Sequence, residues 1–151
     1  MKLSDWSSIA EIISGIAVVV TLIVLIVEVR DNTEVLRVSA YNDNLDSLNE
    51  FGAMVSRDAD SARIWRALIS EETVDLDEID RRRLTDWLFI LFRNYEKAYF
   101  PEQSGLIGRE EWSRFNTNIC NFFELSQSAG IDFTIPLTQE FSGYVADSCG
   151  A

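Results

Sequence analysis

The sequence predicts an all-α protein in which a single N-terminal transmembrane helix continues into a soluble helical bundle. Three observations indicate this fold class. A run of roughly 19 residues from Ile9 to Val27 is almost entirely apolar, which is enough to cross a hydrocarbon core of about 30 Å. After Arg30, apolar residues recur every three or four positions, as in amphipathic helices. Only the short run from Ile131 to Ile135 resembles a strand.

The apolar N-terminal run is interpreted as a retained membrane anchor covering residues 1–30. A cleaved signal peptide would have a more basic start, a shorter apolar core and a small-residue cleavage site. A buried core helix is disfavoured because Val18–Val27, which reads VVVTLIVLIV, is apolar on all sides. The rest of the chain is too small to wrap such a helix. The lipid bilayer is therefore the first expected partner.

Nearly all the polar groups of this anchor share one face. A spacing of four and three residues places seven positions on a single stripe, called here the polar stripe: Ser7, Glu11, Ser14, Val18, Thr21, Leu25 and Glu28. A carboxylate and hydroxyls facing acyl chains are costly, whereas packed copies of the helix would shield them. The stripe therefore predicts a homo-oligomer.

Other interpretations of the stripe stay open. Glu11 lies close enough to the membrane surface to reach water. Ser14 and Thr21 can each donate a hydrogen bond to a carbonyl of their own helix.

The soluble part, residues 31–151, is expected to begin as a continuation of the same helix. Its apolar positions with three-four spacing are Val38, Tyr41, Leu45, Leu48, Gly52 and Val55. The segment Arg57–Asp60 breaks this helix, and Asp58 or Asp60 can cap a short helix that runs through Arg63–Ile69. A polar loop follows up to Asp77.

A long central helix is expected after Asp77, which can cap it. Its apolar positions spread widely around the helix, as expected of a core element; they are Leu84, Trp87, Leu88, Phe89, Ile90, Leu91, Tyr95 and Tyr99. Pro101 is expected to stop this helix.

Two further helices complete the expected bundle. Gly105–Gly108 predicts a turn before a helix whose apolar face begins at Trp112, Phe115, Ile119 and Phe122. Gly130 is expected to end that helix in a left-handed conformation. Pro136 is expected to open a short final helix.

Composition excludes several classes of function. The formal net charge of -12 argues against nucleic acid as a partner, because a phosphate backbone requires a basic surface. The chain has no His, which removes the commonest general base and metal ligand. No pattern for a metal, a cofactor or a nucleophile is present. We therefore expect no enzyme, no cofactor and no metal site.

Two local clusters of charged residues are candidate sites. Arg93 and Glu96 are three residues apart and so lie on one helix face. We interpret them as a structural ion pair that ties the core helix to its neighbours, through Asn94 or Asn42, rather than as an acid-base site. The acidic run between Glu71 and Asp80 lacks the ligand spacing of a calcium loop, so a solvated loop is expected.

The two cysteines, Cys120 and Cys149, have no metal or redox spacing. A disulfide between them is open, but two free thiols in a reducing compartment are favoured. Arg30 and Arg37 on one side of the anchor nearly balance Lys2 and the terminal amine on the other. With the thiols as weak support, residues 31–151 are expected to be cytoplasmic.

Four segments together resemble a group of small bacterial membrane proteins of unknown activity: RDNTEVLRVSAY (30–41), ARIW (62–65), FRNYEKAYF (92–100) and GLIGREEW (105–112). That group has one N-terminal hydrophobic helix followed by a helical domain. The resemblance covers most of the chain and implies an architecture and a location in the bacterial inner (cytoplasmic) membrane. It implies no activity.

Two functions remain open from sequence alone. The favoured one is a homo-oligomeric single-pass membrane protein, with a cation-conducting pore lined by Ser7, Glu11, Ser14 and Thr21 as its narrower form. The alternative is a membrane-anchored helical adaptor or accessory subunit that binds another protein.

Overall fold

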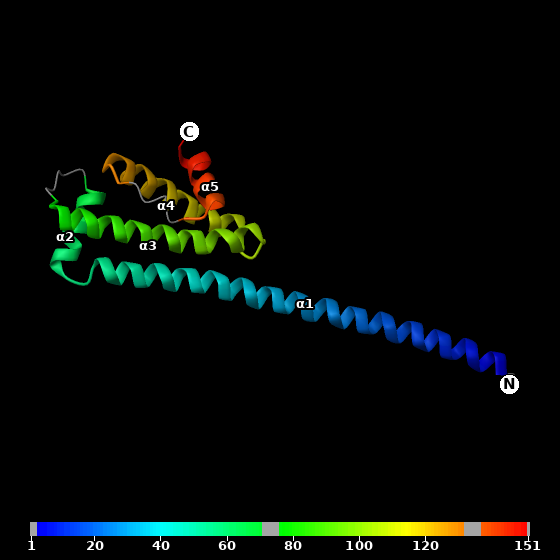
Figure 1. Cartoon of the computed structure of the whole chain (residues 1–151). Helices are drawn as coiled ribbons and strands as arrows, with labels where there is room; N and C mark the ends of the chain where they lie inside the picture. The colour runs from blue at the N-terminus through cyan, green and yellow to red at the C-terminus, as the bar shows by residue number, and fades with distance from the viewer. Residues whose placement is uncertain (1–2, 71–75, 132–136, 151) are drawn as a thin grey trace. The chain divides into compact units, whose positions relative to one another are not determined.

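The computed structural model describes residues 3–70, 76–131 and 137–150, with side chains described from residue 11 onward. Five helices account for most of these residues (Figure 1): α1 (Leu3–Val55), α2 (Ala59–Ile69), α3 (Glu78–Gln103), α4 (Arg109–Ser128) and α5 (Gln139–Cys149). The described residues contain no strand, which confirms the all-α class. The strand candidate at Ile131–Ile135 and the helix start expected at Pro136 fall almost wholly on residues 132–136, outside the described residues.

The chain divides into two compact units, residues 1–38 and residues 39–151. The sequence placed the division between residues 30 and 31. Residues 31–38 remain helical and exposed, so helix α1 continues for about two turns beyond the apolar run before its residues begin to pack. The boundary therefore follows the onset of packing and not the end of the apolar run.

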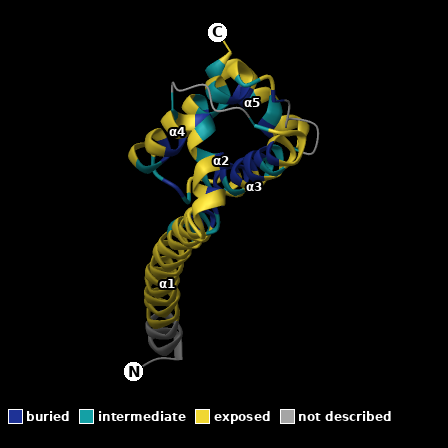
Figure 2. Ribbon diagram, turned by 90° about the vertical axis from the view of Figure 1, so that its left-hand side faces the viewer, coloured by how far each residue is buried: buried dark blue, intermediate teal, exposed yellow. Residues whose placement is uncertain are grey.

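The first unit is the N-terminal part of α1. It is the helix, among the described residues, that is long and apolar enough to cross a membrane by length and composition. None of its most apolar 18-residue window is buried within the chain, as Figure 2 shows by its exposed colouring. This segment is therefore not the core helix of the bundle.

The second unit begins with the C-terminal part of α1, which runs beside α3 (Figure 1). The side chains that α1 buries in the bundle are Asn44, Phe51 and Val55, with Tyr41 and Leu48 half-buried. Their spacing of three and four residues defines one face of the helix. The expected face was partly wrong, because Val38 and Leu45 are exposed.

Two contacts help to hold this part of α1 to the rest of the bundle. The Phe51 ring meets the Trp65 ring of α2 edge to face, with centroids 5.2 Å apart. The Asn94 side-chain amide of α3 donates a 3.2 Å hydrogen bond to the Ser47 carbonyl oxygen. Asn94 was expected to link the Arg93–Glu96 pair to a neighbouring helix. It instead joins α3 to α1 through its own hydrogen bond to Ser47.

Both expected aspartate caps are confirmed. The Asp58 carboxylate accepts a 2.7 Å hydrogen bond from the Ser61 N–H at the start of α2. The Asp77 carboxylate accepts a 2.8 Å hydrogen bond from the Asp80 N–H at the start of α3. Each cap satisfies a backbone donor that has no partner within the first turn of its helix.

Helix α3 is the central element. The buried faces of the bundle turn towards one another in Figure 2. The buried apolar side chains of α3 are Leu84, Trp87, Leu88, Leu91, Phe92, Tyr95, Ala98 and Tyr99. Ile90, expected to be part of the core surface, is 39% exposed.

Pro101 does not stop helix α3, which continues to Gln103. Proline removes one backbone donor and crowds the preceding turn, but here only two residues of the helix follow it. The helix ends where Gly105 adopts a φ of 73°, and the Pro101 carbonyl oxygen accepts hydrogen bonds from the N–H groups of Leu106 and Ile107.

Helices α4 and α5 close the core. The buried residues Trp112, Phe115 and Ile119 confirm the expected face of α4. Gly130 has the expected positive φ, 67°, just beyond the end of α4. Helix α5 begins at Gln139, with the Thr138 side chain as its cap, and it buries Phe141 and Val145 against the bundle.

Candidate functional site

The polar stripe lies along the N-terminal part of α1. On a regular helix its seven positions fall within an arc of about 100°. Ser7 lies in α1, but its side chain is outside the described residues. The other six members, Glu11, Ser14, Val18, Thr21, Leu25 and Glu28, are all exposed. The stripe is therefore exposed along its described length.

One member of the stripe is satisfied by its own helix. The Thr21 hydroxyl donates a 2.9 Å hydrogen bond to the Ala17 carbonyl oxygen, the intrahelical arrangement that sequence left open for it. Thr21 therefore does not need a partner helix to bond its proton. In a membrane, the larger demand for shielding would come from Glu11, since a carboxylate in hydrocarbon is far more costly than a hydroxyl.

The Arg93–Glu96 ion pair is present, with 2.8 Å between Arg93 Nη1 and Glu96 Oε2. The two partners differ in burial: the Glu96 side chain is 6% exposed and that of Arg93 is 52% exposed. The other Glu96 oxygen, Oε1, accepts a 2.6 Å hydrogen bond from the Thr138 N–H.

Glu96 thus joins α3 to the residue that caps α5. The expectation that this pair ties the core helix to a neighbouring helix is met, but the neighbour is reached through a backbone N–H rather than through Asn94 or Asn42. Sequence could not show this contact, because Thr138 is 42 residues away and contributes only main-chain atoms. The arrangement positions the start of α5.

A second charged cluster was missed by the sequence interpretation. Asp60 and Arg63 of α2 alternate with Asp80 and Arg83 of α3, with Arg63 bonded to both aspartates and Arg83 Nη1 lying 2.7 Å from Asp60. A signal existed, because each helix carries an Asp in its first turn that is followed three residues later by an Arg. The cluster fixes the start of α2 against α3.

These contacts shift the titration of one carboxyl. Hydrogen bonds from Arg83 and then Arg63 lower the pKa of Asp60 below its ordinary value of 3.8. A carboxyl with a depressed folded-state pKa stabilises the fold above its unfolded pKa and loses that contribution as pH falls through the folded value. The cluster therefore persists near neutral pH and weakens only in acid.

The two buried tyrosines of α3 belong to the core. Burial raises the pKa of Tyr95 and that of Tyr99, because a phenolate is poorly solvated there. The Tyr99 ring contacts the rings of Trp112, Phe141 and Tyr144, with centroids 5.0–6.0 Å away. Both phenols therefore stay protonated and pack as aromatic core residues.

The favoured expectation of free thiols is wrong. Cys120 of α4 and Cys149, the last residue of α5, form a disulfide, with their Cα atoms 4.9 Å apart. The bond joins residues 29 positions apart. Sequence spacing alone could not decide this, because a disulfide depends on how two helices approach each other. The thiol argument for a cytoplasmic domain is therefore lost.

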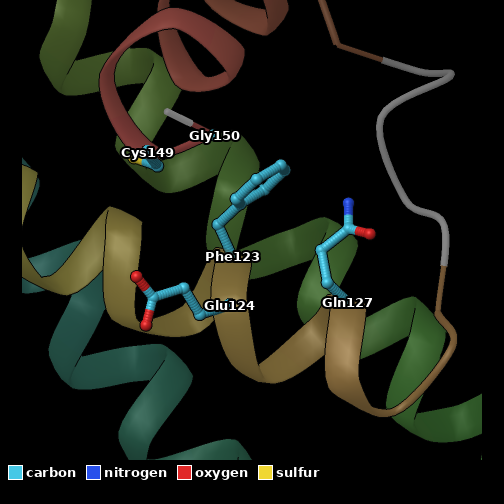
Figure 3. A pocket seen from close by; sticks show the side chains of 5 residues that line it. All are labelled: Phe123, Glu124, Gln127, Cys149 and Gly150. Carbon is cyan, nitrogen blue, oxygen red and sulfur yellow. The ribbon is translucent and has the colours of Figure 1, made fainter.

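An open groove of about 520 Å³ borders this disulfide (Figure 3). Its lining comes from Phe123, Glu124 and Gln127 of α4 and from Cys149 and Gly150 at the end of α5. The groove offers one apolar ring and two exposed polar side chains. It has no convergent set of polar groups that would orient a ligand.

Within the described part of the chain, no group of three or more Asp, Glu or Cys side chains could hold a metal ion. The acidic run weighed as a calcium loop lies partly on residues 71–75, outside the described residues. Its last member, Asp80, is engaged by Arg63.

Comparisons of the chain with protein-family models, with curated proteins and with solved structures found no match.

Proposed function

We propose that this protein is a homo-oligomeric single-pass membrane protein, anchored by α1 and assembled through the polar stripe, in the bacterial cytoplasmic membrane. The observation that carries the proposal is the exposure of α1: every described residue from 11 to 39 is exposed, although residues 12–27 are almost entirely apolar. Such a surface requires either lipid or another protein chain around it. Lipid suits the apolar faces, and a second copy suits the polar stripe.

Helix association in lipid depends on close packing and on polar contacts between helices. Ser14 places a small side chain on the stripe, and Ala17 lies beside it. Among the stripe residues, the carboxylate of Glu11 benefits most from a contact that shields it from lipid and keeps it hydrated. Thr21 contributes packing, since its proton is bonded to Ala17.

The test compares how a large side chain affects association when it is placed on the stripe and when it is placed on the opposite face of the helix. Ser14→Phe blocks close approach at the stripe, whereas Ile16→Phe adds the same ring on the opposite face, where lipid accommodates it. We expect Ser14→Phe to weaken association by at least about tenfold, which corresponds to about 1.4 kcal/mol. Ile16→Phe should leave association within about twofold. Energy transfer between labelled copies in liposomes, at several protein-to-lipid ratios, measures both.

Equal effects of the two variants, or no effect of either, would remove the stripe as the assembly face. The cation-conducting pore stays a narrower prediction within this proposal. The alternative function, a membrane-anchored adaptor, makes a different prediction: exchanging residues 1–30 for an unrelated transmembrane helix would preserve binding of its partner protein.

A further inference from the structure

We infer that the helical bundle, residues 39–151, lies on the oxidising side of the membrane, opposite the cytoplasm, and that the Cys120–Cys149 bond forms there. This inference rests on the membrane anchor proposed above. It reverses the orientation expected from the sequence, where free thiols counted in favour of a cytoplasmic domain.

The two cysteines are placed to pair with each other. Cys120 and Cys149 are both half-buried, and their Cα separation of 4.9 Å falls in the range that a disulfide needs. They are the two cysteines of the chain, so no other intrachain pairing competes. The bond ties the C-terminal end of α5 to α4. Helix α5 also packs against the core through Phe141 and Val145.

The compartment decides whether this bond persists. Cytoplasmic thiol systems keep protein cysteines reduced, whereas the outer side of the membrane allows disulfides to form and remain. Formation there proceeds by thiol–disulfide exchange with a disulfide-bearing oxidant. The two cysteine thiols lose two protons and two electrons as their S–S bond forms, and the oxidant's own S–S bond is reduced to two thiols.

The charges beside the anchor do not oppose this orientation strongly. Arg30 and Arg37 flank its carboxyl side, and they nearly balance Lys2 and the terminal amine on its amino side. Acidic residues contribute little to orientation, so the many carboxylates of the bundle do not decide it. The disulfide is then stronger evidence for the orientation than the flanking charges are. An adaptor with this orientation would meet its partner outside the cytoplasm.

The experiment labels introduced cysteines in the full-length chain with a membrane-impermeant maleimide. Arg81→Cys places a thiol on the exposed surface of α3. Position 81 is more than about 20 residues from the anchor in the sequence, so its lost charge does not affect orientation. Asp5→Cys places one on the amino side and removes an acidic residue, which also counts little. Both variants keep Cys120 and Cys149. Labelling is compared in intact cells, in permeabilised cells, and after denaturation with a reductant.

We expect Arg81→Cys to take one label in intact cells and three only after denaturation and reduction. Asp5→Cys should take none until the membrane is permeabilised. Labelling of Asp5→Cys but not Arg81→Cys in intact cells would overturn the orientation. So would reaction of Cys120 and Cys149 without reductant. Alkaline carbonate extraction separates this outcome from failure of the anchor, because a chain released into the soluble fraction contradicts the membrane proposal itself.

Discussion

Replacing both cysteines, Cys120→Ser with Cys149→Ser, is expected to lower the free energy of unfolding of the bundle by about 3.5 kcal/mol. The disulfide closes a loop between residues 29 positions apart. In the chain-entropy account, a cross-link over a loop of this length removes that much conformational freedom from the unfolded state. For a unit of this size, the midpoint of thermal unfolding should fall by roughly 15 °C.

Thermal and denaturant unfolding of the full-length protein in detergent measure this loss. A reductant supplies the matched control. It should lower the stability of the unaltered protein to the level of the double variant and leave the double variant unchanged. If the unaltered protein loses nothing on reduction, Cys120 and Cys149 are not bonded in the folded protein.

Replacing Glu96 with alanine is expected to lower the free energy of unfolding by about 2–3 kcal/mol. The substitution removes the acceptor of the 2.6 Å hydrogen bond from the Thr138 N–H. An unpaired buried donor costs about 1–3 kcal/mol, and the space left by the buried side chain adds to this. Because Thr138 caps α5, the loss should loosen α5 before the rest of the bundle.

Two matched variants separate the contacts of Glu96. Glu96→Gln keeps an oxygen that can accept from Thr138, so it should cost about 1 kcal/mol. Arg93→Ala should cost no more than about 1 kcal/mol, since the Arg93 side chain is 52% exposed and its ion pair is screened by water. Hydrogen exchange at the amides of α5 reports the local effect. Equal losses for Arg93→Ala and Glu96→Ala would show that the ion pair, and not the Thr138 contact, stabilises this region.

Much of the bundle could be predicted because local signals were strong. Asp58 and Asp77 cap helices by contacts to residues only three positions away, and Gly130 ends α4 through its own backbone preference. The apolar positions of α3 repeat with the helix period and are mostly buried. In each case, the feature that determines the structure lies within a few residues of the position it acts on.

The errors concern contacts between distant residues. Tyr41, Asn44 and Leu48 form the packed face of α1, whereas Val38 and Leu45 have equally helical spacing and stay exposed. Periodicity defines a helix but leaves open which of two adjacent apolar faces meets the core. Pro101 illustrates a different limit, because the cost of a proline falls when the helix ends within a turn of it.

The contacts of the candidate site show the same difference between neighbouring and distant residues. Spacing alone identified the Arg93–Glu96 pair, since its partners are neighbours on one helix. The hydrogen bond from Thr138 to Glu96, the Asp60–Arg83 contact and the Cys120–Cys149 bond all join different helices. The polar stripe is defined within a single helix, but its proposed partner is a second chain, so neither the sequence nor the single-chain fold displays that contact.

The mass of the detergent-extracted, full-length protein tests self-association most directly. Light scattering with the detergent contribution subtracted, repeated over a wide concentration range, gives this mass. We expect a defined multiple of the 17.2 kDa chain, reduced towards one chain by Ser14→Phe and retained by Ile16→Phe. A mass of one chain at every concentration would contradict assembly through the polar stripe.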